Sequence, residues 1–129
     1  MKRVTGIGGI FFKAKAAPAL QAWYQRHLGI DVQAWGGAAF DWADESGVAV
    51  AGTTAWLIDS QESDHFAPSA ASFMVNYRMA DLLGLSKALK EEGCNVLEKI
   101  DDSAYGKFAW VINSEDNKAS CGSQLLGGG

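Results

Sequence analysis

The sequence predicts an α+β protein in which one βαβββ unit occurs twice. Each half of the 129-residue chain combines a single segment of helical periodicity with several short strand-like runs. The halves also share a Gly-apolar-Asx-Val pattern, at Gly29–Val32 and again 64 residues later at Gly93–Val96, each time where a helix should give way to a strand. With 48% hydrophobic and 20% charged residues, the chain has the composition of an ordinary folded domain. We therefore expect a single domain made of two related modules.

The first half is expected to begin with a strand over Val4–Lys15, which is rich in β-branched and aromatic residues. Alternation along this strand places Phe11 and Phe12 on opposite faces. Pro18 suits the first turn of a helix, and Gly29 is placed to end it. Three strand-like runs then complete the unit, at Ile30–Trp35, Ala38–Trp42 and Thr53–Asp59.

The second half repeats this order after a polar linker over Ser60–Ser69. A strand over Phe73–Met79 leads to a helix that Asp81 caps and that stops at Gly93. The remaining strands are expected at Asn95–Lys99, Lys107–Asn113 and Lys118–Leu125, with a polar turn at 113–117 between the last two. We thus divide the single domain into a module of residues 1–59, a linker of 60–69, a module of 70–126 and a flexible glycine tail.

Charge and cysteine content narrow the classes of function. Eleven basic and fifteen acidic residues give a net charge of -4, which would repel nucleic acids. Cys94 and Cys121 are too few for a disulfide framework, and reduced thiols fit a cytoplasmic protein. No stretch approaches the roughly 20 apolar residues that cross a bilayer, and no cleavable signal follows the N-terminus. We expect a cytoplasmic protein that binds neither nucleic acid nor membrane.

Several motifs in order along the chain point to one superfamily. The first half contains Gly8-Gly9-Ile10-Phe11-Phe12, then Leu20-Gln21-Ala22-Trp23-Tyr24 and Leu28-Gly29-Ile30-Asp31-Val32. The second half contains Val75–Leu82, Glu92–Val96 and a hairpin from Tyr105 to Asn117. In this order and spacing the chain resembles the vicinal oxygen chelate superfamily, which includes glyoxalase I, extradiol dioxygenases, and the fosfomycin and bleomycin resistance proteins. The resemblance covers nearly the whole chain. It implies a curved mixed sheet around a cavity, helices on the outer faces, and a homodimer that commonly completes the site.

The same resemblance implies a metal site that this sequence lacks. The family's metal ligands would fall at about Gly9, Met74 and Ser120, none of which can bind a divalent metal as histidine and glutamate do. The only histidines lie elsewhere: we expect His27 to be a partly buried helix residue and His65 a solvated linker residue, with a role at the cavity rim as the alternative. We therefore expect no bound metal and no cofactor.

The cavity implied by the resemblance would be lined by aromatic and a few polar side chains. Strand alternation from the inferred ligand positions turns alternate residues of the first and fifth strands inward, and similar phase reasoning extends the set to the other strands. The candidate ligand-binding residues are Phe11, Phe40, Trp42, Trp56, Met74, Asn76, Arg78, Phe108, Trp110 and Ser120. The alternative for each aromatic residue is ordinary core packing, and for Arg78 it is solvent or an internal salt bridge.

These observations lead to three hypotheses for function. The first is metal-independent binding, by sequestration, of a small planar or aromatic molecule, with no catalytic residues, as in the bleomycin-type resistance members. The second is an enzyme: a glyoxalase-like lyase or isomerase, or a dioxygenase-like oxygenase, with an atypical metal site, or a metal-free catalyst that uses the same cavity. The third is a protein-interaction module, which would expose an apolar patch in place of a closed pocket.

Overall fold

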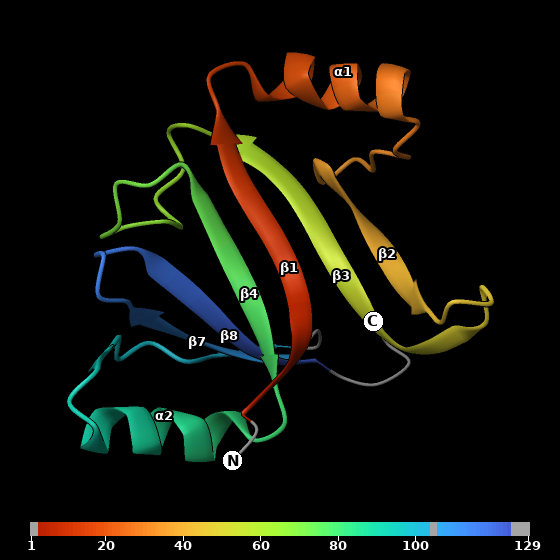
Figure 1. The fold of residues 1–129 in the computed structure, drawn as a ribbon. Coiled ribbons are helices and arrows are strands. Elements are labelled where there is room, and N and C mark those ends of the chain that lie inside the picture. Colours follow the sequence, from red (N-terminus) through yellow and green to blue (C-terminus); the bar gives the residue numbers. More distant parts are fainter. Residues whose placement is uncertain (1–2, 104–105, 125–129) are drawn as a thin grey trace.

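A computed structural model describes residues 3–103 and 106–124, which form one eight-stranded sheet and two helices (Figure 1). The strand order is β2-β3-β1-β4-β8-β7-β5, with β6 paired to β7. The elements are β1 (Val4–Ala14), α1 (Ala17–Leu28), β2 (Gly37–Ala43), β3 (Ala49–Ser60), β4 (Phe73–Met79), α2 (Leu82–Glu91), β5 (Asn95–Val96), β6 (Asp101–Ser103), β7 (Gly106–Ile112) and β8 (Lys118–Gln124). Leu125 and the expected glycine tail, Gly127–Gly129, lie outside the described residues.

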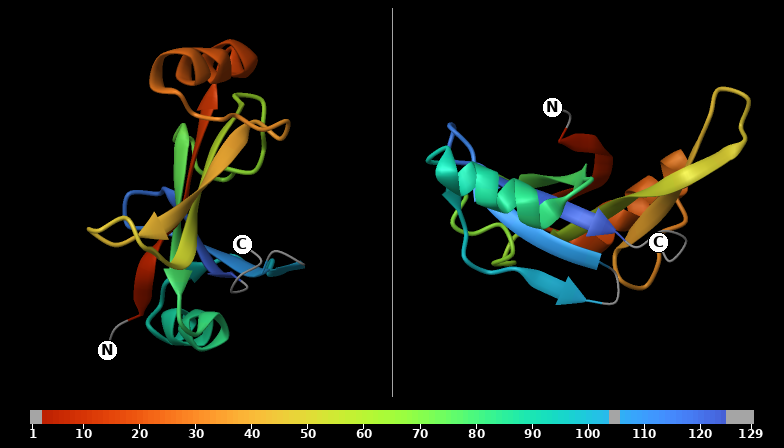
Figure 2. Two further views of the ribbon diagram at one scale, coloured as in Figure 1. Left: turned by 90° about the vertical axis from the view of Figure 1, so that its right-hand side faces the viewer. Right: turned by 90° about the horizontal axis from the view of Figure 1, so that it is seen from below.

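Strand pairing repeats between the two halves of the sheet. β1 runs parallel to β3, and β3 runs antiparallel to β2. In the same way β4 runs parallel to β8, and β8 runs antiparallel to β7. The two first strands, β1 and β4, meet as an antiparallel pair at the centre. The fold is therefore α+β with a mixed sheet, as predicted, and Figure 2 shows that this sheet is twisted and curved.

One predicted strand is absent and another is shortened. Residues Ile30–Trp35 form no strand: the Gln33 amide donates to the Gly37 carbonyl, and the Gly36 amide donates to the Gln33 carbonyl in a turn. Gly36 has φ +93°, so the chain reverses just before β2 instead of extending along it. The first module is thus βαββ. In the second module the strand expected over Asn95–Lys99 is limited to β5, and β6 follows as a separate strand.

Helix α1 begins and ends as the sequence predicts and covers one face of β1 and β3. Proline lies in its first turn, and Gly29 ends it in the left-handed conformation at φ +69°. The Tyr24 ring packs edge-on against Phe12 and Trp56, with centroids 6.2 and 5.1 Å away. His27 is exposed beside Trp23, so its expected partial burial is wrong.

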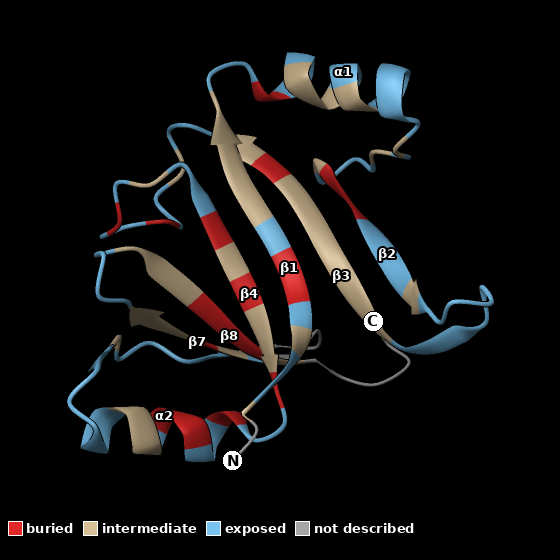
Figure 3. Cartoon of the chain, in the orientation of Figure 1, coloured by how far each residue is buried: buried red, intermediate tan, exposed pale blue. Residues whose placement is uncertain are grey.

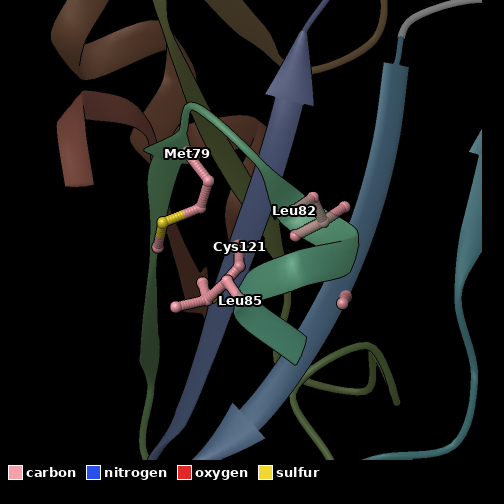
Figure 4. Close-up of a cluster of buried hydrophobic side chains, with 5 residues drawn as sticks. Met79, Leu82, Leu85 and Cys121 are labelled. Carbon is pink, nitrogen blue, oxygen red and sulfur yellow. The ribbon is translucent and has the colours of Figure 1, made fainter. Parts of the chain in front are cut away.

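Helix α2 packs on the same face of the sheet at the other module. Asp81 caps it, because its Oδ1 accepts a hydrogen bond from the Gly84 amide at 3.1 Å. The main hydrophobic cluster lies beneath the helix and consists of Met79, Leu82, Leu85, Ala109 and Cys121 (Figure 4). Burying one such leucine is worth about 2 kcal/mol. Figure 3 shows buried residues in α2 and in the adjacent strands β4 and β8.

The two helices leave the opposite face of the sheet free of helix. Phe12 and Cys121 face the helices, so alternation turns their neighbours Phe11 and Ser120 to the other face. The predicted placement of helices on the outer faces is confirmed. Within residues 3–103 and 106–124, neither helix has the length and apolar content needed to cross a membrane.

Candidate ligand-binding site

A cavity of about 490 Å³ lies on the sheet face opposite the helices, a size typical of small-molecule sites. Strands β1, β3, β4, β7 and β8 form its floor, and the segments 64–66 and 97–101 form its sides. Its apolar lining consists of Phe11, Leu57, Phe66, Met74, Leu97, Phe108 and Trp110. Its polar lining consists of Asp59, Asp64, His65, Asn76, Lys99, Asp101, Lys118 and Ser120.

Most of the residues predicted to line a cavity do so. They are Phe11, Met74, Asn76, Phe108, Trp110 and Ser120. Strand register brings them together, because Phe11 lies opposite Met74, while Ser120 lies opposite both Asn76 and Trp110. Ligand binding by these residues stays a prediction.

The other four predicted residues lie outside this cavity. Trp56 packs against Phe12 and Tyr24 beneath α1, so its predicted inward orientation is wrong. Phe40 pairs with Thr54, which shares the phase of Trp56 along the sheet, and 45% of Phe40 is exposed. The residues of β3 that face the cavity are Leu57 and Asp59, which alternate with Trp56 along the strand.

Trp42 and Arg78 form a separate cluster near the opposite end of the strands. The Arg78 guanidinium lies 5.1 Å from the centre of the Trp42 ring. Trp42 Nε1 donates a hydrogen bond to Thr54 Oγ1 at 2.7 Å, which fixes the ring. The pair borders a shallower pocket of about 380 Å³. Within the described residues Arg78 forms no salt bridge. The internal salt bridge considered from the sequence is therefore not found there, and the guanidinium packs on the Trp42 ring instead.

Asn76 is the most buried polar residue of the cavity, with only 1% of its surface exposed. Its Nδ2 donates a hydrogen bond to Ser120 Oγ at 2.7 Å. Its Oδ1 is buried and has no hydrogen-bond partner among the described residues. A buried acceptor without a partner is costly, and such groups are rare in folded proteins. A hydrogen-bond donor on a bound molecule would satisfy it.

Charged side chains surround the cavity at its rim. Lys118 Nζ donates to the His65 carbonyl at 2.7 Å and lies 5.3 Å from the centre of the Trp110 ring. Burial lowers the pKa of Lys118, the positive charge of Lys99 lowers it further, and Asp64 opposes both.

His65 is exposed to solvent, as expected for a linker residue, and it also lies at the rim of the cavity. Its Nδ1 lies 3.5 Å from Asp59 Oδ2, although 75% of the side chain is exposed. The backbone of His65 is fixed by the bond from Lys118. The imidazole is therefore held beside the cavity while remaining open to water.

The comparisons identify the fold. No protein-family model matches the sequence, and a comparison with curated proteins finds no match. Among solved structures, a methylmalonyl-CoA epimerase from Streptomyces coelicolor in complex with 2-nitronate-propionyl-CoA aligns with a TM-score of 0.65 and 15% identity, over 95% of this chain and 99% of that one. The methylmalonyl-CoA epimerase from Mycobacterium tuberculosis aligns at 0.59 and 13%, over 95% and 89%. A glyoxalase/bleomycin resistance protein/dioxygenase superfamily member from Vibrio splendidus aligns at 0.58 and 9%, over 92% and 97%.

The chain has the vicinal oxygen chelate fold. Structural similarity establishes the fold, but at sequence identities this low it leaves the activity open.

The positions implied for metal ligands in the vicinal oxygen chelate fold do lie close together here. Gly9 is opposite Asn76, Asn76 is opposite Ser120, and Met74 is two residues before Asn76 on the same strand. Their side chains supply at most one neutral hydroxyl and one thioether, which is a poor donor set for a divalent first-row metal. Across residues 3–103 and 106–124, no group of three or more His, Cys, Asp or Glu side chains could hold a metal ion. The residues do not fit the metal associated with this fold.

Apart from the alternative given for His65, sequence reasoning missed the part of the cavity wall that comes from the linker. Phe66 is fully buried there, and Lys13 lies over its ring at 5.2 Å. An aromatic residue inside an otherwise polar segment was the available signal for this packing. Leu57 and Asp59 were missed because the phase assigned to Trp56 turned them to the wrong face.

Proposed function

We propose that the protein binds a small planar or aromatic molecule in this cavity and does so without a metal ion. The observation that carries the proposal is Asn76, a buried amide on the cavity wall whose Oδ1 has no hydrogen-bond partner in the described part of the chain. Leaving a polar group buried and unpaired costs about 1–3 kcal/mol, which a bound donor would recover. Binding sites of this kind combine apolar walls with a few polar groups that fix orientation.

The aromatic walls support a flat ligand. Phe11 lines the cavity from β1, and Phe108 and Trp110 line it from β7. Offset or edge-on packing against such rings contributes about 0.5–1.5 kcal/mol per pair beyond the area buried. Because the donor set at Gly9, Met74 and Ser120 does not fit a metal, sequestration is favoured over metal-assisted chemistry.

Calorimetric titration with a panel of planar aromatic compounds tests the proposal. The protein is purified without chelator, and its metal content is measured by elemental analysis before titration. We expect a compound of the panel to bind with unchanged affinity after EDTA treatment. Trp110→Ala should weaken this binding at least tenfold, while Trp35→Ala, which removes an exposed ring outside the cavity, should not. Failure of every compound to bind would refute the proposal.

An enzymatic use of the same cavity is the second candidate, and one observation favours it. His65 and Asp59 are arranged as a base and an orienting carboxylate, with 3.5 Å between Nδ1 and Oδ2. Stoichiometric nickel, zinc, iron or manganese in the purified protein would favour a metal enzyme over sequestration. Chemical conversion of a bound panel compound, lost in His65→Gln, would favour catalysis without metal.

A further inference from the structure

We infer that the ligand of this cavity is an aromatic carboxylate, whose anionic group lies between Lys99 and Lys118 and whose opposite end donates a hydrogen bond to Asn76. The inference rests on the proposed function and specifies the chemical class of the ligand. It depends on three features. Lys99 and Lys118 form no ion pair in the described part of the chain, the nearby carboxylates and aromatic faces already have other partners, and Lys118 and Ser120 are two residues apart on β8.

Lys99, on the side of the cavity, and Lys118, on its floor, place two positive charges in the same cavity. Neither forms an ion pair with an acidic side chain in the described part of the chain. Lys118 is fixed in place by its bond to the His65 carbonyl and by the Trp110 ring. An ammonium group has three donors, so Lys118 has donors left for a ligand. Burial and the charge of Lys99 lower the pKa of Lys118, and Asp64 offsets this lowering only in part.

The carboxylates of the same cavity form no ion pair with Lys99 or Lys118 in the described part of the chain. Asp59 faces His65 through Oδ2, and its Oδ1 accepts a hydrogen bond from the Ser60 amide at 2.9 Å. Asp64 attracts Lys118, but the pKa of Lys118 remains lowered despite it. Asp101 is exposed at the start of β6. The lysine pair therefore remains available to an external anion.

The aromatic faces argue against a cationic ligand. Lys118 lies over the Trp110 ring, and Lys13 lies over the Phe66 ring at 5.2 Å. A ligand cation that sought these faces would meet a lysine at each of them. A ligand with a negative end would instead gain a charge-assisted hydrogen bond at Lys118.

Spacing along β8 sets the length of the ligand. Lys118 and Ser120 are two residues apart, so they point to the same face roughly 7 Å from one another. Ser120 Oγ holds Asn76 at 2.7 Å, which places the unpaired Oδ1 near this second position. A benzene ring with substituents at both ends spans such a gap. The apolar ring would then lie among Phe11, Phe108 and Trp110.

Three probes of nearly equal shape separate the charge from the donor. para-Hydroxybenzoate has both groups, para-hydroxybenzamide lacks the charge, and para-methoxybenzoate lacks the donor. By calorimetry we expect para-hydroxybenzoate to bind about tenfold or more tightly than either analogue, since each analogue loses one of the two polar contacts. Its affinity should fall as salt is added, while that of the amide should change little.

Variants assign the charge effect to the lysines. Lys118→Met and Lys99→Met should each weaken para-hydroxybenzoate binding and reduce its preference over the amide, and circular dichroism checks that both remain folded. Lys107→Met is the matched control, because Lys107 is exposed on β7 and alternates with the cavity residue Phe108. Equal affinity for all three probes, or an unchanged preference in both lysine variants, would overturn the inference while leaving the proposed function intact. No binding by these probes or by any planar compound would overturn both.

Discussion

The hydrogen bond between Asn76 and Ser120 leads to a prediction about the stability of the free protein. Only 1% of Asn76 and 3% of Ser120 is exposed, and Asn76 Oδ1 has no partner among the described residues. Ser120→Ala would leave Asn76 Nδ2 unpaired as well. We expect this single change to be destabilising, whereas the double change Asn76→Leu with Ser120→Ala should not be.

The magnitude follows from the polar groups that each variant leaves buried. Ser120→Ala removes one hydrogen bond and strands its donor, at a cost of about 1–3 kcal/mol. The double variant removes both partners together with the unpaired Oδ1, whose burial already costs the wild-type protein a similar amount. We therefore expect the double variant to lie between unchanged and about 2 kcal/mol more stable than wild type. The two positions should be coupled by about 2 kcal/mol or more.

Urea unfolding followed by tryptophan fluorescence measures these free energies, with unchanged m-values as the check on a common two-state transition. Calorimetry on the double variant should show that ligand binding is lost while stability is kept. Equal destabilisation in the single and double variants would refute the reasoning, because packing rather than hydrogen bonding would then dominate at this site.

Two further predictions concern the sheet and its core. Gly52→Ala should destabilise the protein by more than about 2 kcal/mol in urea unfolding, because Gly52 has φ +142° and an added Cβ would overlap the Trp42 ring. The control is Gly47→Ala, which should cost only about 1 kcal/mol because Gly47 has φ +83° with open space around it. Equal costs for the two variants would argue against the overlap. Burial raises the pKa of the Cys121 thiol from 9.0 to about 11. The free energy of unfolding should therefore be unaffected by this thiol below pH 9 and should fall by up to about 3 kcal/mol as the pH rises through 11. The stability of Cys121→Ala should therefore fall less over this pH range than that of wild type, and parallel curves would contradict the assignment.

Local sequence signals predicted the ends of both helices and most strands. Asp81 and Gly29 act at short range, because a cap or a left-handed residue is decided by the immediate backbone. The run Ile30–Trp35 has strand composition, but the turn that ends at Gly36 diverts it from the sheet. Strand composition indicates a preference, and pairing with a neighbour decides whether a strand forms.

The candidate site was predictable where two strands could be phased against each other. On β4, β7 and β8, alternation counted from the ligand positions that the family resemblance implies placed Asn76, Phe108, Trp110 and Ser120 together, and all four line the cavity. On β3 the same reasoning chose the wrong phase for Trp56. Alternation states which residues share a face, but the partner strands decide which face meets the cavity.

The sequence by itself determined that a strand, a helix and further strands follow one another twice, though not the number of strands in each half, as well as the helix limits and the lack of imidazole or carboxylate groups at Gly9, Met74 and Ser120. Those properties depend on neighbouring residues or on the identity of single side chains. Only the tertiary structure decided that the linker closes one side of the cavity, since Lys118 reaches a carbonyl 53 residues away in sequence. It likewise decided that Asn76 Oδ1 finds no partner among residues 3–103 and 106–124, because partners of a buried atom come from several strands at once.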